Sequence, residues 1–450
     1  MKQREAWFEL AESYIQFQNR CLSPFHAVER VASDLQEEGF QFLDIHKEWN
    51  LDLNGRYFLP HHDGKSLLAF ILGEKAPVEH GFNIACAHTD SPVLRLRLRP
   101  WDSDQGQVRL LSQVHGGLIA RTWLDRPLKL AGAVYNLVRK NKSVDYDSKS
   151  LLPKLARQLV QSERAIGLIP DIAIHLDRNK NSEGEINLET MLTACCGMSH
   201  DKDLAKIKKQ FWQELGLKGG EPDGFELSFS PFDEHAFVGL NDDFIVGPRH
   251  DDLAMVFAIY KALKDTPVQA KRMKTSIVGF FDAEETGSQT CSGAASSFLR
   301  DALTRIIRHH PAGGDLKDLE RAFAQSYLIS ADMAHAFHPA HANKYDAHHK
   351  ININAGLVIK ENANDRYATS GASATIFRGL CEAAEVPVQE YINRQDLGCG
   401  STIGPTLAAQ LNCHTVDVGA AMWAMHSTGE SMGSRDLLYA KQLFQTFFKS

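Results

Sequence analysis

The segment that decides the fold reads IVGFFDAEETGS and runs from Ile277 to Ser288. It opens with β-branched and aromatic residues around one glycine, the composition of a buried strand. Asp282, Glu284 and Glu285 then follow within four residues, ahead of Gly287. Carboxylates crowded beyond a buried strand raise one another's pKa, and desolvation adds to that cost, so a cation beside them would be stabilising. A solvated acidic loop explains this segment equally well when it is taken alone.

The composition limits the class of protein. A chain of 450 residues can hold two domains and a large core. Its 43% hydrophobic and 23% charged residues are typical of a soluble globular enzyme. The net charge of −7 argues against nucleic-acid and anionic membrane partners. We see no secretory signal and no apolar run that would span a bilayer, and the eight cysteines lack disulfide-framework spacing, which indicates reduced thiols in the cytoplasm.

Three other apolar runs also end in residues that bind metals. His88 and Asp90 follow the run 82–87, Asp332 follows 326–331, and His426 follows 422–425. Asp251 stands at the start of a predicted helix over 254–263. Singly, these residues are explained by turns and by a helix N-cap. Because ligands gather beyond the carboxyl ends of strands in α/β sheets, together they predict one site.

The texture of the chain predicts a discontinuous arrangement of domains. Alternating strands and helices over 1–92 and 238–450 indicate an α/β domain with a parallel sheet. Between them, 93–237 is predicted to be an inserted domain of mixed β and α structure, with a helical piece near 151–161. Further helices are predicted at 6–19, 24–38, 294–303, 372–384 and 406–411.

The donor types predict which metals the site would bind. Histidines and several carboxylates suit zinc, with cobalt or manganese as alternatives. The acids exceed what one tetrahedral ion needs, whereas two ions about 3.5–4 Å apart and bridged by a carboxylate would use them. The glycine-rich loop around Gly400 lacks the lysine of a phosphate-binding loop, so we expect its backbone amides to face a substrate carbonyl. No serine or cysteine nucleophile pattern is present.

At this point the sequence resembles the aspartyl aminopeptidases, a family of co-catalytic two-metal aminopeptidases. The resemblance extends over nearly the full length, in the family's order. Its motifs are Ala87–Pro92, Ala173–Leu176, Pro248–Asp251, Asp282–Ser288, Ser330–Ala336, Arg366–Ala368, Gly400–Pro405 and Ala424–Ser427. The resemblance implies a mixed, Rossmann-like, three-layer α/β catalytic domain over 1–92 and 238–450, and an inserted, β-rich lid or dimerisation domain over 93–237. The chain departs from the pattern at His250 and Asp252, where relatives often carry an apolar residue and asparagine.

The resemblance implies a role for each matching residue. Asp251 would bridge two metals, His88 and Asp332 would complete one site, and Glu285 and His426 the other. Glu284 would be the general base, and Asp90 would orient His88. An alternative set takes His88, His175 and His426 as the zinc ligands; we favour the carboxylate-rich set because His175 lies in the inserted region.

The implied activity is removal of an N-terminal Asp or Glu from peptides with a free amino terminus. Lys360 would read the acidic side chain, with His335 and Tyr367 nearby, although sequence alone favours a surface lysine at that position. His175 would reach the substrate, in the family's manner from a neighbouring subunit of a tetrahedral dodecamer built from dimers.

Two other functions stay open. A deacylase or carboxypeptidase on a related two-metal scaffold would need an arginine for a free carboxylate, and Arg249 or Arg366 could supply it. A catalytically inactive, shell-forming binding protein is the second alternative, against which the complete acid set argues.

Overall fold

The computed structural model describes residues 2–141, 143–148, 150–183, 185–199, 204–267, 272–312 and 314–450. Contacts divide them into two compact units. The first comprises Met1–Ser91, His235–Met425 and Gly429–Ser450, and the second comprises Pro92–Glu234 with the short segment His426–Thr428. The α/β class, with mixed sheets and a β-rich region, is as predicted from the sequence.

A nine-stranded mixed sheet forms the centre of the first unit among the described residues. Its order is β1 (Gln41–Phe42), β2 (Arg56–Pro60), β3 (Leu67–Ile71), β16 (Thr275–Phe281), β4 (Phe82–His88), β17 (Tyr327–Ala331), β21 (His414–Gly419), β19 (Leu357–Glu361) and β20 (Val388–Ile392). The four middle strands, β16, β4, β17 and β21, are mutually parallel. Their carboxyl ends therefore meet at one edge, where ligands gather in such sheets.

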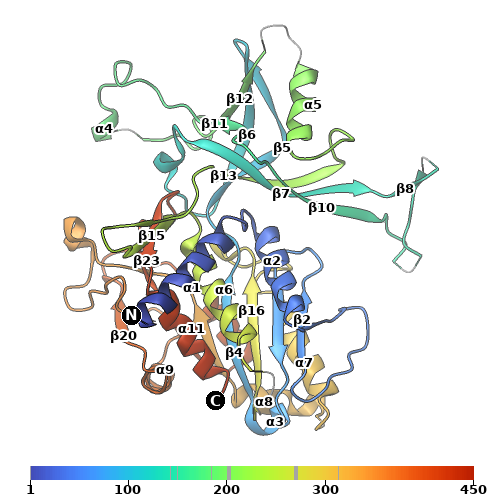
Figure 1. Ribbon diagram of the computed structural model, residues 1–450, viewed down its shortest axis with the longest axis vertical. Helices are drawn as coiled ribbons and strands as arrows, with labels where there is room; N and C mark the ends of the chain where they lie inside the picture. Colours follow the sequence, from blue (N-terminus) through green and yellow to red (C-terminus); the bar gives the residue numbers. More distant parts are fainter. Residues whose placement is uncertain are drawn as a thin grey trace. The chain divides into compact units, whose positions relative to one another are not determined.

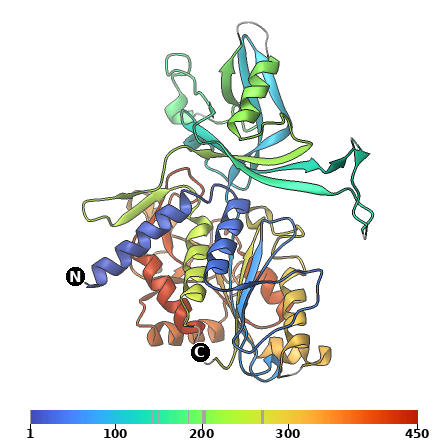
Figure 2. The same ribbon diagram turned by 45° about the vertical axis from the view of Figure 1, so that its right-hand side comes forward.

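Helices cover both faces of this sheet, which gives three layers. On one face lie α1 (Lys2–Gln18), α2 (Pro24–Glu37), α6 (His250–Lys264), α9 (Gly371–Ala383) and α11 (Asp436–Phe447). Figures 1 and 2 show α1, α6 and α11 side by side. On the other face lie α7 (Phe298–His309), α8 (Leu319–Ala324) and α10 (Ile403–Leu411). Alternate strand residues serve the two cores: Ala85 and Ala87 face the first layer, and Ile84 and Cys86 the second.

Smaller elements complete the first unit. A five-stranded sheet has the order β14 (Ala236–Val238), β15 (Phe244–Gly247), β23 (Glu430–Gly433), β22 (Ala421–Trp423) and β18 (Ala334–His335). The short helices are α3 (Pro77–His80), η2 (Glu284–Thr286), η3 (Leu316–Asp318) and η4 (Pro339–Lys344). Ala283 has a left-handed backbone, with φ of 62°, so the chain turns sharply between β16 and η2.

The second unit is a β-rich domain with its own core around Trp123, Phe229 and Trp212. The sheet that its described residues form has seven strands, in the order β10 (Leu155–Gln161), β7 (Pro127–Leu137), β11 (Gly167–Leu168), β12 (Ala194–Met198), β6 (Gln107–His115), β5 (Val93–Asp104) and β13 (Gly224–Pro231). A further β7–β13 pairing closes the strand order on itself. The remaining elements are η1 (Ala120–Trp123), β8 (Arg139–Lys140), β9 (Ser143–Val144), α4 (Lys180–Glu183) and α5 (Leu204–Glu214).

Some sequence-based assignments of secondary structure were wrong. The predicted helical piece at 151–161 contains strand β10, which pairs antiparallel with β7 from Leu155↔Leu137 to Gln161↔Ala131. Its leucines at three- and four-residue intervals imitate helical spacing, but cross-strand pairing decided the outcome. The helix predicted at 294–303 begins later, as α7, and α5 was not predicted. Within the described residues, no helix combines the length and the apolar character needed to cross a membrane.

Candidate metal and active site

The site begins where β4 delivers His88 beside Asp251 at the start of α6. His88 Nε2 lies 3.3 Å from Asp251 Oδ1, and both side chains are buried. The Nδ1 atom lies 3.0 Å from the backbone oxygen of Asp90, an acceptor, so Nδ1 donates, and in the neutral ring Nε2 is the atom with the lone pair. Burial alone would lower the pKa of His88, but the carboxylates of Asp251 and Asp90 outweigh it and raise that pKa well above its usual value.

Asp90 also holds the acidic loop after β16 in place. Its Oδ1 accepts the backbone N–H of Glu284 at 2.9 Å, and its Oδ2 accepts that of Glu285 at 3.3 Å. The Asp90 carboxylate is itself buried and lies 3.5 Å from His88 Nδ1. Asp90 therefore fixes the imidazole and both glutamates relative to one another. The sequence predicted only that Asp90 orients His88.

Three of these residues form a group that could hold a metal ion. One donor atom from each of His88, Asp251 and Glu285 lies within 4.8 Å of the other two. The donors are one imidazole nitrogen and two carboxylate oxygens, all of them atom types that bind zinc in proteins. Behind them lies Asp252, which accepts the His88 backbone N–H at 3.1 Å. Its other oxygen, Oδ1, is buried without a hydrogen-bond partner in the part of the chain that the structure describes.

Asp332, which directly follows β17, is a further carboxylate whose charge acts on this group of acids. Its charge raises the pKa values of Asp252 and Glu284, so the groups interact, although Asp332 lies outside the three-residue group. Burial raises the pKa of Asp332 itself, which Lys360 opposes. Lys360 Nζ lies 3.3 Å from Asp332 Oδ1 and donates to the backbone oxygen of Met333 at 3.2 Å.

Glu284 has the most useful acid–base properties of the cluster. Burial, together with the charges of Asp332 and Asp251, raises its pKa from 4.5 to about 8, against the opposing effect of His88. A carboxyl whose pKa lies near neutrality can both accept and return a proton under working conditions. The pKa therefore fits a general base.

The predicted substrate-binding residues of the first unit lie on several elements. Lys360 is 2% exposed rather than a surface lysine, and its ammonium lies 5.2 Å from the centre of the Tyr367 ring. Tyr367 is also buried, whereas His335 is exposed and packs edge-on against Tyr391 at 5.9 Å. Gly400 lies on an exposed loop, with open space where a Cβ would point.

Two predicted histidines belong to the second unit. His175 is exposed in the loop between β11 and α4. His426 groups with this unit through Gly117, whose backbone oxygen lies 3.0 Å from its Nδ1, and through Ile119, whose backbone N–H it accepts. The roles of both residues stay predictions.

The matching family model settles the affiliation of the chain. It describes the aminopeptidase I zinc metalloproteases, M18, and covers residues 17–448. The chain belongs to this family. It is therefore a zinc metalloaminopeptidase by family, and the predicted class of enzyme is confirmed at that level.

Individual relatives match this M18 chain over nearly its whole length. A curated protein of Stutzerimonas stutzeri (strain A1501), named Probable M18 family aminopeptidase 2, is 39% identical over 446 residues and 98% of both chains. A cryo-EM structure of the Ape4 and Nbr1 complex matches with a TM-score of 0.91 and 32% identity, over 99% of this chain and 86% of that one. The S. cerevesiae mApe1 dodecamer shares the fold, with a TM-score of 0.82 at 24% identity over 99% and 97% of the chains.

The residues of this M18 chain fit a zinc ion. His88, Asp251 and Glu285 have the donor chemistry, and the surplus of buried carboxylates, including the unsatisfied oxygen of Asp252, calls for positive charge. The sequence did not single out Glu430, whose buried Oε2 accepts the Asp251 N–H at 3.2 Å, or Ser91, which donates to the Asp251 backbone oxygen at 2.8 Å. Glu430 follows no apolar run and has no sequence signal, whereas Ser91 lies inside a quoted motif.

Proposed function

We propose that this M18 enzyme removes the N-terminal residue of peptides with a free amino group, with a preference for Asp or Glu, and that Glu284 is its general base. The observation that carries the proposal is the arrangement of Glu284 next to the His88–Asp251–Glu285 group, fixed by the two backbone N–H bonds to Asp90. A divalent cation in this group supplies a Lewis acid that makes water more acidic and polarises a peptide carbonyl.

The chain's own residues then carry the proton transfers. The Glu284 carboxylate takes a proton from the attacking water and returns it to the leaving amine nitrogen, which its pKa of about 8 permits. Asp90 keeps Glu284 and Glu285 in register with His88, so the base and the ligands move as one rigid set. We propose that Asp332 and His426 would join His88, Asp251 and Glu285 in holding two divalent ions, with zinc, cobalt or manganese as the metal.

We propose that Lys360 reads the acidic side chain of the substrate. An ammonium has three N–H donors. Two of them are directed to Met333 and Asp332, and the third is available for a carboxylate. Tyr367 forms the neighbouring wall, and His335 and the Gly400 loop complete the substrate contacts. His175 would then approach from a neighbouring subunit.

Assembly and location are part of the same proposal. The S. cerevesiae mApe1 structure, which shares this fold, is a dodecamer. Large apolar side chains are exposed on the second unit, among them Leu98 at 82%, Leu151 at 75% and Leu176 at 77%, and such surfaces commonly become interfaces. We propose a dodecamer built from dimers, in the cytoplasm, where the eight free thiols would stay reduced.

Of the two arginines that a carboxypeptidase could use to bind a free carboxylate, one is buried. Arg249 is buried and its guanidinium lies 3.5 Å from the backbone oxygen of Gln18, so it does not present a surface for a substrate carboxylate. Arg366 is exposed and remains the arginine that this alternative would use.

One panel of substrates tests the proposal. Chromogenic amides of Asp, Glu, Leu and Ala are assayed with chelator and after zinc, cobalt or manganese is added back. We expect chelator-sensitive hydrolysis that is fastest for Asp or Glu and that an N-acetyl group abolishes. Hydrolysis of the N-acetylated amides would favour a deacylase or endopeptidase, and no hydrolysis with any metal would favour an inactive shell protein.

A further inference from the structure

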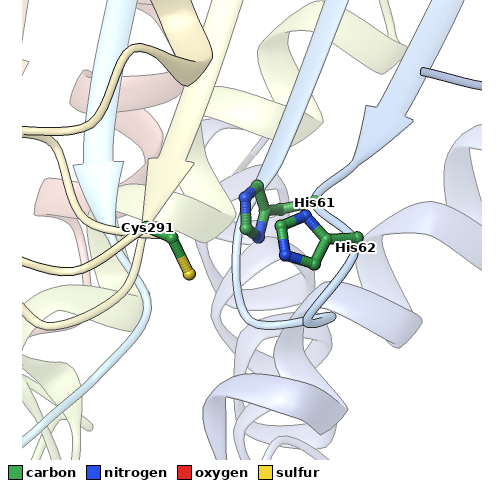
Figure 3. A group of neighbouring side chains, drawn as sticks. All are labelled: His61, His62 and Cys291. Atoms are coloured by element: carbon green, nitrogen blue, oxygen red, sulfur yellow. The ribbon is translucent and has the colours of Figure 1, made fainter. Parts of the chain in front are cut away.

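A second group of metal-binding side chains lies at the turn between β2 and β3. It contains His61 and His62 from that turn and Cys291 from the loop that follows η2, and one donor atom from each lies within 4.8 Å of the other two. Figure 3 shows the two imidazoles next to each other and the Cys291 sulfur on the neighbouring loop. All three residues belong to the first unit and none belongs to the group around His88.

The turn and the loop are already held together by polar contacts on either side of this group. Ser66 donates to the backbone oxygen of Ser292 at 2.6 Å and accepts the backbone N–H of Asp282 at 2.9 Å. Lys65 forms an ion pair with the buried Asp282 at 3.0 Å. The backbone on which the three donors are carried is therefore fixed, which lowers the entropic cost of bringing them onto one ion.

His61 has the orientation of a histidine prepared for a metal. Its Nδ1 lies 2.9 Å from Asp63 Oδ1, and because an ionised carboxylate only accepts, Nδ1 donates and Nε2 holds the lone pair. A carboxylate behind a ligand histidine is the usual second contact in zinc sites. The ring is buried and packs edge-on against Phe298 at 4.9 Å, so its rotamer is fixed.

His62 and Cys291 provide the adaptable part of the site. The His62 ring centre lies 4.0 Å from that of His61, and His62 is exposed. Cys291 is exposed and forms no disulfide. Tetrahedral zinc places its ligand atoms about 3.3–3.8 Å apart. Exposed side chains can rotate over the remaining distance without disturbing the core.

We propose that His61, His62 and Cys291 bind a zinc-class divalent cation, separate from the carboxylate-rich site, with water in the fourth position. Two imidazoles and one thiolate make a softer donor set than one imidazole and two carboxylates, so this site favours zinc or cobalt over manganese. The ion would join the β2–β3 turn to the chain segment 282–293, which also carries Glu284 and Glu285. Its occupancy would therefore restrain the loop that holds the catalytic base.

Cobalt spectroscopy on the full-length protein distinguishes the two sites. The group around His88 contains no sulfur, so a thiolate-to-cobalt charge-transfer band comes from a cysteine outside that group, and the cysteine variants assign it. We expect that band when the chelator-treated protein is titrated with Co²⁺. Cys291→Ser should abolish it and lower the zinc content by about one ion per chain. Cys195→Ser, at a half-buried thiol of β12, is the matched control and should leave both unchanged.

The restraint is measured by amide hydrogen exchange over 282–293. Zinc should slow exchange there in the wild type and in Cys195→Ser, and not in Cys291→Ser or His62→Ala. Absence of the charge-transfer band, or its survival in Cys291→Ser, would overturn the site itself. A band that is present while exchange in 282–293 ignores zinc would overturn the restraint of the loop.

Discussion

Asp90 Oδ1 accepts the backbone N–H of Glu284 at 2.9 Å, while the backbone oxygen of Asp90 meets Nδ1 of His88 at 3.0 Å. Two residues that lie 194 positions apart in the sequence are thereby joined at the carboxyl ends of β4 and β16. The contact explains why an acid stands at this position: both carboxylate oxygens accept, one from Glu284 and one from Glu285.

Asp90→Asn is the direct test of this contact. An amide keeps one acceptor but turns an NH₂ group toward the second backbone N–H, so one of the two bonds is lost and the acidic loop shifts. We expect kcat to fall about 10–100-fold and zinc affinity to weaken by a similar factor, the usual effect of disturbing a group behind metal ligands. Steady-state kinetics and competition with a zinc chelator measure both; unchanged values would remove Asp90 from the positioning role.

Glu284→Gln tests the proton transfer. Because glutamine has nearly the same shape but cannot accept a proton, we expect kcat to fall at least ~10²–10⁴-fold. Zinc content, measured by elemental analysis, and thermal stability with metal present should stay close to the wild type. Asp301→Asn, on the surface of α7, serves as a control for loss of one carboxylate and should be fully active. Near-normal turnover in Glu284→Gln would assign the base to another group.

The raised pKa of Glu284 also predicts how the metal-free protein responds to pH. The folded state binds the proton more tightly than the unfolded chain, so stability falls as pH rises from 4.5 towards about 8. In the metal-free form, Glu284→Gln should therefore be more stable than the wild type at the upper end of this window, by on the order of 1–2 kcal/mol. Thermal unfolding of both chelated proteins across the window measures the difference, and parallel curves would contradict it.

The strand ends were predictable because burial and polarity change abruptly there. β4 and β17 are fully buried in alternating contact with both helical layers, so their apolar runs stand out, and the polar residue after each run marks the edge of the sheet. His88, Asp332 and the acids after β16 were predicted at strand ends in this way, and the structure places them there. Asp417, whose charge acts to raise the pKa of Lys360, was not predicted. It lies inside β21, where it accepts from Thr402 at 2.6 Å, and has no boundary signal.

The strand β10 and the surroundings of His426 and Lys360 were not predictable, because they depend on contacts between segments that are distant in the sequence. The leucines near β10 fit a helix as well as a strand, and only the pairing with β7 decided between them. His426 follows an apolar run like the other candidates, yet its backbone and ring contacts are with Ile119 and Gly117. Lys360 has the pattern of a surface lysine, but its strand is covered on both sides by β21 and β20.

Gly419→Ala should disturb the site from behind. A Cβ at Gly419 would overlap the backbone oxygen of Asp332, whose own N–H bonds to Val418 in the adjoining strand. We expect a loss of roughly 1–3 kcal/mol in the free energy of unfolding and lower activity, because Asp332 must shift. Gly379→Ala, in α9 with open space around it, is the matched control and should be neutral or more stable by about 1 kcal/mol. Equal effects at the two glycines would show that the overlap is relieved without moving Asp332.

Lys360→Met tests how the enzyme selects its substrate. Methionine keeps most of the volume of this buried side chain but removes the charge that faces Asp332 and, by our proposal, the substrate carboxylate. We expect the ratio of kcat/KM for Asp over Leu substrates to fall roughly 10-fold or more, since a hydrogen bond between charged groups is lost. The ratio matters because the loss of the Asp332 partner lowers both rates together, whereas the loss of recognition lowers only the rate for Asp. If both rates fall equally, Lys360 serves Asp332 alone and another group reads the acidic side chain. Lys360→Arg keeps a positive charge at this position. If that charge contacts the substrate, Lys360→Arg should retain more of the preference for Asp than Lys360→Met does.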